Sequence, residues 1–183
     1  MILNSHTIIS PYTNEWKDKF STEKDLILDL LKDKILAIEH IGSTSIPGLS
    51  AKPIADIAII VNEFEPADVF SKDLSKLGYK YNSSSTERHF YIKGDPESFH
   101  LSISFANRGG FWVRQILFRD YLRNNPESKK EYEELKKKLL TEDPTGVNSY
   151  FAGKDAFVKK ILTLANWKEN QLYSDYMKDK KLN

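Results

Sequence analysis

The sequence predicts an α+β protein, in which a mixed sheet of about five strands with flanking helices is followed by a C-terminal helical half. Short β-branched and aromatic segments lie between residues 35 and 105, whereas apolar residues at helical spacing dominate from residue 107 onward. No Gly/Ser-rich linker separates residues 1–106 from residues 107–183. We therefore expect the two parts to form one compact unit.

The first part is expected to alternate helices and strands. A helix over residues 13–31 has its apolar residues on one stripe, and a crossover helix over residues 65–77 is followed by Gly78, a residue typical of helix ends. Turns are expected at residues 82–85, Asn-Ser-Ser-Ser, and at residues 94–96, Gly-Asp-Pro. The expected strands are 35–41, 54–61, 79–81, 89–93 and 99–105.

The second part is expected to be helical. One helix follows Gly109-Gly110 and ends near Pro126, a charged helix covers residues 127–140, and a third begins near Asn148. The lysine-rich tail after Tyr173 is expected to fray.

The composition excludes several classes of protein. Lys and Arg number 27 against 26 Asp and Glu, so no global charge favours long nucleic acid. The chain has no cysteine, and its four histidines are not grouped at zinc-ligand spacing, so any metal is expected to have oxygen ligands. No segment approaches a membrane span or a secretory signal, which predicts a cytoplasmic protein without a membrane partner.

Residues 39–61 contain the clearest candidate site. Gly42 is followed by three hydroxyl residues, Ser43, Thr44 and Ser45, and such a bend can surround an anion. Asp56 then stands in a nearly unbroken apolar strand. Because an unpaired buried carboxylate is costly, Asp56 is expected to face a polar site or a cation. The combination is typical of a site for phosphate and a metal ion.

These residues also carry a family resemblance. Gly42-Ser43, followed about a dozen residues later by a strand acid, resembles the nucleotidyltransferase superfamily related to DNA polymerase beta. The run Ile-Glu-His-Ile-Gly-Ser-Thr-Ser-Ile-Pro-Gly-Leu-Ser-Ala-Lys-Pro-Ile at 38–54, His-Leu at 100–101 and Leu-Phe-Arg-Asp-Tyr-Leu-Arg at 117–123 resemble the GrpB family. The resemblance implies a nucleotidyltransferase-like sheet, a nucleotide or other small phosphorylated ligand, and magnesium.

On this resemblance, Asp56 is the catalytic and magnesium-holding acid, and His100 assists as a proton-transfer or phosphate-bonding group. Superfamily members commonly use an Asp-x-Asp pair, whose second position is Ala58 here. That departure removes one ligand of a two-metal site. Many relatives read His-Leu-His where this chain has Ser102, a second departure.

Further candidates for phosphate or nucleotide binding are spread along the chain. They are the bend residues Gly42, Ser43, Thr44 and Ser45, together with Lys52, Arg88, Tyr150 and Lys154. Tyr150 and Lys154 stand four residues apart on one helical face and match a Tyr-x-x-x-Lys motif of the family. Each candidate has a structural alternative: a simple turn, a solvated lysine, or a satisfied polar group at the edge of the core. Arg119, Asp120 and Arg123 are better explained as an ion-pair network between helix and sheet.

Three functions remain open from the sequence. The first is magnesium-assisted nucleotidyl transfer, which gains support if Glu39, Glu63 or Glu87 projects beside Asp56. The second is a non-catalytic nucleotide- or phosphate-binding module with a degenerate metal site, which gains support if Asp56 pairs with a lysine or arginine. The third is an enzyme that acts on phosphate esters or coenzyme precursors, an analogy suggested by the GrpB-like domains that occur fused to dephospho-CoA kinases.

Overall fold

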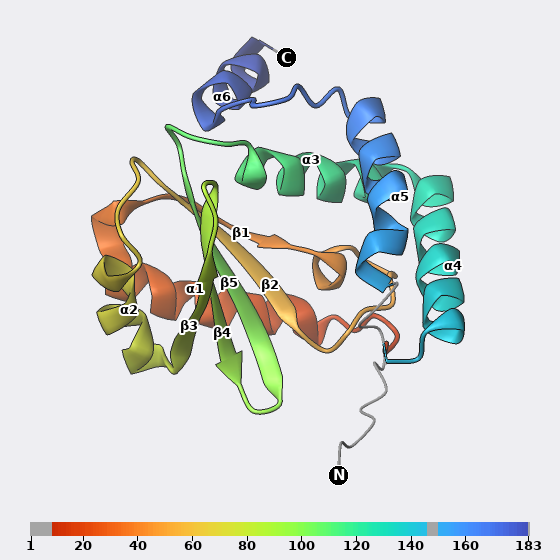
Figure 1. Cartoon of the computed structure of the whole chain (residues 1–183), viewed down its shortest axis with the longest axis horizontal. Coiled ribbons are helices and arrows are strands. Elements are labelled where there is room, and N and C mark those ends of the chain that lie inside the picture. The colour runs from red at the N-terminus through yellow and green to blue at the C-terminus, as the bar shows by residue number, and fades with distance from the viewer. Residues whose placement is uncertain (1–8, 146–149, 183) are drawn as a thin grey trace.

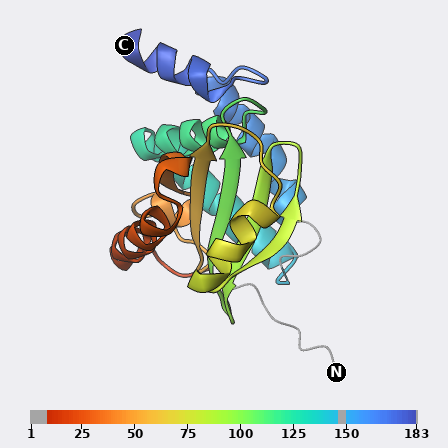
Figure 2. The ribbon, with the colours of Figure 1, turned by 90° about the vertical axis from the view of Figure 1, so that its left-hand side faces the viewer.

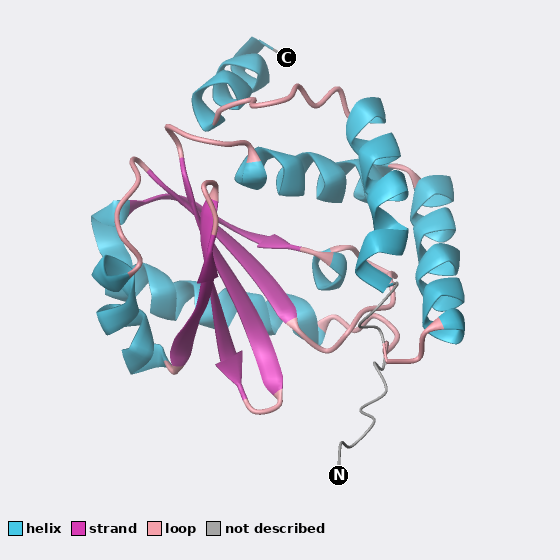
Figure 3. Cartoon of the chain, in the orientation of Figure 1, coloured by secondary structure: helices cyan, strands magenta, loops and turns pink. Residues whose placement is uncertain are grey.

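The computed structural model describes residues 9–145 and 150–182, and it confirms the α+β prediction. Five strands form one mixed sheet in the order β1-β2-β5-β4-β3 (Figures 1 and 3). Neighbouring strands are antiparallel except for β2 and β5, which run parallel. The strands are β1 (Ile35–Ile41), β2 (Ala55–Val61), β3 (Tyr79–Ser84), β4 (Arg88–Gly94) and β5 (Glu97–Phe105).

One face of the sheet is covered by α1 (Glu15–Leu31) and α2 (Asp68–Leu74). Ile27 of α1 and Phe70 of α2 are fully buried in one cluster with Ile57 and Ile59 of β2. Apolar residues at helical spacing on α1 thus meet every second residue of β2. The crossover segment after β2 ends at Gly78, which has a φ of +84°, as the helix-end pattern predicted.

The opposite face of the sheet carries α3 (Phe111–Asn124), where Trp112 and Ile116 pack on Ala58 and Ile60 of β2. Beside α3 lie α4 (Pro126–Glu142) and α5 (Tyr150–Leu164) (Figure 1). A third cluster joins these helices to the segment after the bend, and its buried members are Ile46, Leu49, Leu122, Tyr132, Phe157 and Ile161. The loop before β2 is therefore held by the helical part of the chain.

Two sequence expectations were wrong. The tail forms a helix, α6 (Tyr173–Leu182), because Tyr176 is buried edge-on against Trp112, with ring centroids 5.9 Å apart. Figure 2 shows α6 above α3 at the top of the molecule. Residues 82–84 are not a turn but the end of β3, where Ser83 and Ser84 pair with β4 after an irregularity in register. The predicted helix start near Asn148 lies outside the described residues.

No helix within the described residues is both long and apolar enough to cross a lipid bilayer.

Candidate functional site

The hydroxyl bend packs directly against Asp56. Strand β1 ends at Ile41, Gly42 takes a φ of +67°, and Ser43–Ser45 form the short 3₁₀ turn η2 (Figure 3). A Cβ atom added at Gly42 would lie 2.9 Å from the Asp56 Cγ and would also collide with Oδ2. Position 42 therefore requires glycine for two reasons, the left-handed backbone angle and the close approach of the Asp56 carboxylate.

Two of the three hydroxyls hold the bend together. The Ser45 hydroxyl donates to the Gly42 carbonyl at 2.6 Å. The Thr44 hydroxyl donates to the Ile54 carbonyl at 3.2 Å and lies 3.0 Å from His40 Nε2. Because its only proton goes to Ile54, Thr44 accepts a hydrogen bond from the histidine. The alternative of a structural turn thus holds for these two side chains.

An open pocket of about 270 Å³ lies beside the bend, and we call it the Asp56 pocket. It is lined by the bend, the start of β2, the start of β5 and the start of α5. The lining residues are Ser43, Thr44, Ala51, Lys52, Ile54, Asp56, Glu97, His100, Tyr150 and Lys154. The structure therefore brings together most of the site residues suggested by the sequence. Gly42 packs against Asp56 without lining this pocket, and Ser45 and Arg88 do not line it either.

His100 lies between two carboxylates. Its Nδ1 is 3.1 Å from Asp56 Oδ1, and its Nε2 is 2.8 Å from Glu97 Oε2. Asp56 and His100 are in register on the parallel strands β2 and β5, so the sheet itself sets this pairing. Burial lowers the pKa of His100, but hydrogen bonds to Asp56 and Glu97 and their charges outweigh burial, and the pKa is raised above 6.5. A protonated imidazole donates from both nitrogens, which matches the two acceptors.

None of the three glutamates that the sequence suggested as neighbours of Asp56 lies beside it. Glu39 Oε2 is 2.6 Å from Arg119 Nη1, and Glu87 accepts two hydrogen bonds from Arg114. Glu63 follows the far end of β2 and lines a different pocket. The second carboxylate near Asp56 is Glu97, which the sequence analysis missed. A regular strand would place Glu97 and His100 on opposite faces, so no sequence pattern pointed to it.

The side chains around Asp56 do not form a site for a pair of metal ions. Ala58 offers no oxygen, and the His100 ring separates Asp56 from Glu97. Among the described residues, no group of three or more His, Asp or Glu side chains could hold a metal. Magnesium is commonly bound by one or two carboxylates together with substrate phosphates and water. Asp56 is therefore the residue at which such an ion would be held.

Two lysines meet over one aromatic ring in this pocket. The ammonium groups of Lys52 and Lys154 lie 5.1 and 3.9 Å from the ring centroid of Tyr150. Burial lowers the pKa of Lys154 to about 8, and the nearby charge of Lys52 contributes to this shift. Burial also lowers the pKa of Lys52, although Glu97 and Asp56 oppose it. Since a nearby anion would favour the charged form of both lysines, this part of the pocket suits a negatively charged group.

A third lysine, Lys136 of α4, was missed by the sequence analysis. It is 1% exposed, donates to the Ser50 carbonyl, and lies 3.4 Å from the Ser43 hydroxyl. Burial lowers the pKa of Lys136 to about 8. The sequence spacing could have predicted the burial of Lys136, because it follows the buried Tyr132 by four residues and shares its helical face.

The two remaining candidates have structural partners. The Ser45 carbonyl accepts hydrogen bonds of 3.0 and 2.7 Å from Arg123 Nε and Nη2. Arg88 of β4 donates to Ser102 at 2.7 Å, and its guanidinium lies 4.5 Å from the ring centroid of Phe111. Arg88 thus connects the sheet to α3, which matches the alternative of a polar group at the edge of the core.

We expect the pKa values of the two histidines, His100 and His40, to be shifted in opposite directions from the ordinary value of 6.5. His100 should have a pKa above 6.5, whereas His40, with a pKa lowered by burial and by Arg123 and Arg119, should titrate near pH 4. The pKa of His100 is higher in the folded protein than in the unfolded chain. Protonation of His100 therefore stabilises the fold fully at pH values below the unfolded pKa, and this stabilisation is lost as pH rises through the folded pKa. NMR titration of the imidazole resonances without divalent cations measures both values.

The matched variants are Asp56→Asn and Glu63→Gln. Asp56→Asn should lower the pKa of His100, while Glu63→Gln, at the other end of β2, should leave it unchanged. A His100 pKa that does not respond to Asp56→Asn would contradict the bridged arrangement.

Fold and site together define a class: an α+β protein with a polar pocket between a hydroxyl bend, a strand acid and a helical half. The family model described as GrpB protein matches residues 6–164. The chain belongs to the GrpB family, as the sequence motifs predicted.

Known relatives cover most of the chain. The crystal structure of conserved protein GrpB from Enterococcus faecalis is 36% identical, has a TM-score of 0.79, and covers 86% of this chain and 96% of that one. UPF0157 protein YqkA of Bacillus subtilis is 36% identical over 87% of this chain, which spans 48% of YqkA. The glutamate-rich protein GrpB of Alkalihalophilus pseudofirmus is 34% identical over 85% of this chain and 93% of its own length.

Two more distant similarities concern the expected activities. Cid1 in complex with the UTP analogue UMPNPP is 15% identical with a TM-score of 0.43, which is too low to carry an argument. A dephospho-CoA kinase of Mycolicibacterium paratuberculosis is 26% identical over 69% of this chain, and the match covers 38% of that enzyme.

Proposed function

We propose that this protein binds a small phosphate-bearing ligand in the Asp56 pocket, with a nucleotide as the first candidate. The observation that supports this is the pair of partly buried lysines, Lys52 and Lys154, above Tyr150. Hydrogen bonds from charged donors to phosphate oxygens are among the stronger ones in proteins. The sequence motif of Gly42-Ser43 followed by Asp56, which resembles that of nucleotidyltransferases, favours a nucleotide over other phosphates.

In this proposal each residue of the pocket has a role. Lys52 and Lys154 bind the anionic oxygens, and Ser43 and Thr44 also line the pocket. His100 is hydrogen-bonded to Asp56 and Glu97, which raise its pKa and favour its charged form. Magnesium would be held at Asp56 with the ligand's phosphate and water, and it would neutralise phosphate charge.

Nucleotidyl transfer is the second candidate. The observation that favours it is His100, whose raised pKa suits proton transfer, although it must exchange its hydrogen bond to Glu97 for one to a phosphate oxygen. A two-ion transfer uses a second metal ligand that Ala58 does not supply, whereas binding does not need one. Binding is therefore the function that we place first.

We expect Lys154→Gln to weaken binding of ATP or pyrophosphate by about 10- to 100-fold, the effect of losing one charge-assisted hydrogen bond. Isothermal titration calorimetry with each nucleoside triphosphate, with and without magnesium, measures this change. Affinity of the wild type should also fall as pH rises through about 8, the pKa of Lys154. The matched control is Lys159→Gln, an exposed lysine on the same helix that does not line the pocket.

Equal affinity of Lys154→Gln and Lys159→Gln, or no binding of any triphosphate at millimolar concentration, would refute the proposal. Asp56→Asn separates the two candidates. It should abolish the effect of magnesium on binding, and it should abolish incorporation of labelled nucleotide into a cell extract if transfer occurs. Equal incorporation by Asp56→Asn and wild type would remove Asp56 from any catalytic role.

A further inference from the structure

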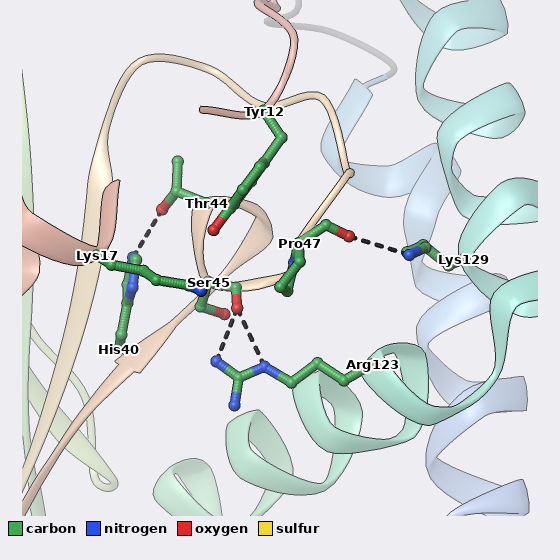
Figure 4. Close-up of a pocket in the computed structure, with 8 residues that line it drawn as sticks. All are labelled: Tyr12, Lys17, His40, Thr44, Ser45, Pro47, Arg123 and Lys129. Carbon is green, nitrogen blue, oxygen red and sulfur yellow. Dashed lines mark hydrogen bonds between the residues drawn. The ribbon is translucent and has the colours of Figure 1, made fainter. Parts of the chain in front are cut away.

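A second pocket lies on the other side of the bend (Figure 4). Its volume is about 390 Å³, and we call it the Tyr12 pocket. Its wall includes Tyr12, Lys17, His40, Arg123 and Lys129, together with part of the bend. The bend residue Thr44 lines both this pocket and the Asp56 pocket, so one wall separates two distinct spaces.

The Tyr12 pocket is positively charged. Its three cations come from three helices, Lys17 from α1, Arg123 from α3 and Lys129 from α4, and none of the described residues that line it carries a carboxylate. Within the described part of the chain, neither lysine forms a salt bridge. Arg119 and Arg123 share two carboxylates, since Arg119 pairs with Glu39 and Asp120 and Arg123 lies 3.5 Å from Asp120. The excess of positive charge in the pocket therefore comes from Lys17 and Lys129.

Backbone carbonyls fix two of these cations. Both Nε and Nη2 of Arg123 donate to the Ser45 carbonyl, and Lys129 donates to the Pro47 carbonyl at 3.0 Å. A carbonyl carries no net charge, so these bonds position the cations without neutralising them. In Figure 4 the side chains of Tyr12 and Lys17 also point toward the bend, Tyr12 from the top of the view and Lys17 from the left.

The pKa of His40 reflects the positive charges around it. Its ring stacks on Phe20 at 4.9 Å between centroids, and its Nε2 hydrogen-bonds Thr44. Burial and the charges of Arg123 and Arg119 lower its pKa to about 4, so the ring is neutral at physiological pH. The histidine thus adds no charge, and the unbalanced charge belongs to Lys17 and Lys129.

We propose that the Tyr12 pocket is a second ligand site, which binds a phosphomonoester group. The phosphate dianion is held by Lys17, Lys129 and Arg123, and it accepts a hydrogen bond from the Tyr12 hydroxyl. The rings of Tyr12 and Pro47 flank the organic part of the ligand. This site is independent of the ligand proposed for the Asp56 pocket.

The test is an NMR titration of the ¹⁵N-labelled full chain with inorganic phosphate and with phenyl phosphate. Amide signals of Lys17, Ser45 and Arg123 should shift, and phenyl phosphate should bind more tightly than inorganic phosphate. The double variant Lys17→Gln/Lys129→Gln should weaken binding at these signals by about 10-fold or more, since two phosphate contacts are lost. Neither substitution removes a buried side chain, so the fold should persist.

The matched control is Lys19→Gln/Lys130→Gln, which removes the same charge from exposed positions on the same two helices. This control should bind like the wild type, and Lys154→Gln should leave the Tyr12 pocket signals unchanged. Equal weakening in both double variants, or no shift of these signals at about 20 mM phosphate, far above a useful affinity, would overturn the proposal. Because the Asp56 pocket is followed by its own signals, failure of one site does not imply failure of the other.

Discussion

Gly42→Ala should reduce the free energy of unfolding by about 2–4 kcal/mol, since it combines a left-handed backbone angle with a collision in a packed site. Gly42 has a φ of +67°, and an added Cβ would meet Asp56 at 2.9 Å from Cγ and 3.0 Å from Cβ. Relief would require the bend to move away from β2. Urea denaturation followed by circular dichroism measures the loss.

Gly48→Ala in the same loop is the matched control. Gly48 also has a positive φ, +78°, but the nearest atom to an added Cβ is the flexible end of Lys129 at 3.7 Å. Gly48→Ala should reduce the free energy of unfolding only by the cost of the left-handed backbone angle, about 1–2 kcal/mol. The difference between the two variants measures the collision with Asp56. Equal losses would contradict the close packing of the bend on this carboxylate.

Arg119→Met should reduce the free energy of unfolding by about 2–4 kcal/mol, because several hydrogen bonds of a buried charged group are lost together. Arg119 is 6% exposed and donates to Glu39 at 2.6 Å, to Asp120 at 2.7 Å and to the His40 carbonyl at 2.9 Å. The acids it binds are partly exposed and regain water when it is removed, which limits the loss. This residue ties α3 to the end of β1, as the ion-pair prediction stated.

Arg114→Met on the same helix provides the comparison. Arg114 pairs with Glu87 at 2.6 Å, but its side chain is 26% exposed and its partner 28%. Its removal should cost about 1 kcal/mol, near the upper range for exposed ion pairs. Urea denaturation of both variants measures the two losses in the free energy of unfolding. A loss for Arg119→Met no larger than that for Arg114→Met would show that α3 is held by its apolar contacts alone.

The extent of sequence-based prediction differs between fold and site. Strand β1 has the predicted bounds, and α1 and α3 begin and end within about two residues of prediction, because apolar periodicity is a local property. The tail was predicted to fray because its lysines dominate the local pattern. Burial of Tyr176 against Trp112 of α3, more than sixty residues earlier in the chain, stabilises it as α6.

For the site, the sequence by itself determined the chemistry of the bend and its acid. Gly42, the hydroxyl run and Asp56 lie within one short stretch, and the register of two strands then brings in His100. The tertiary structure alone decided which distant charges surround them: Lys136 beside the Ser43 hydroxyl, and the three cations of the Tyr12 pocket. The physical reason is that charges act through space, so helices remote in sequence set the electrostatics on both sides of the bend.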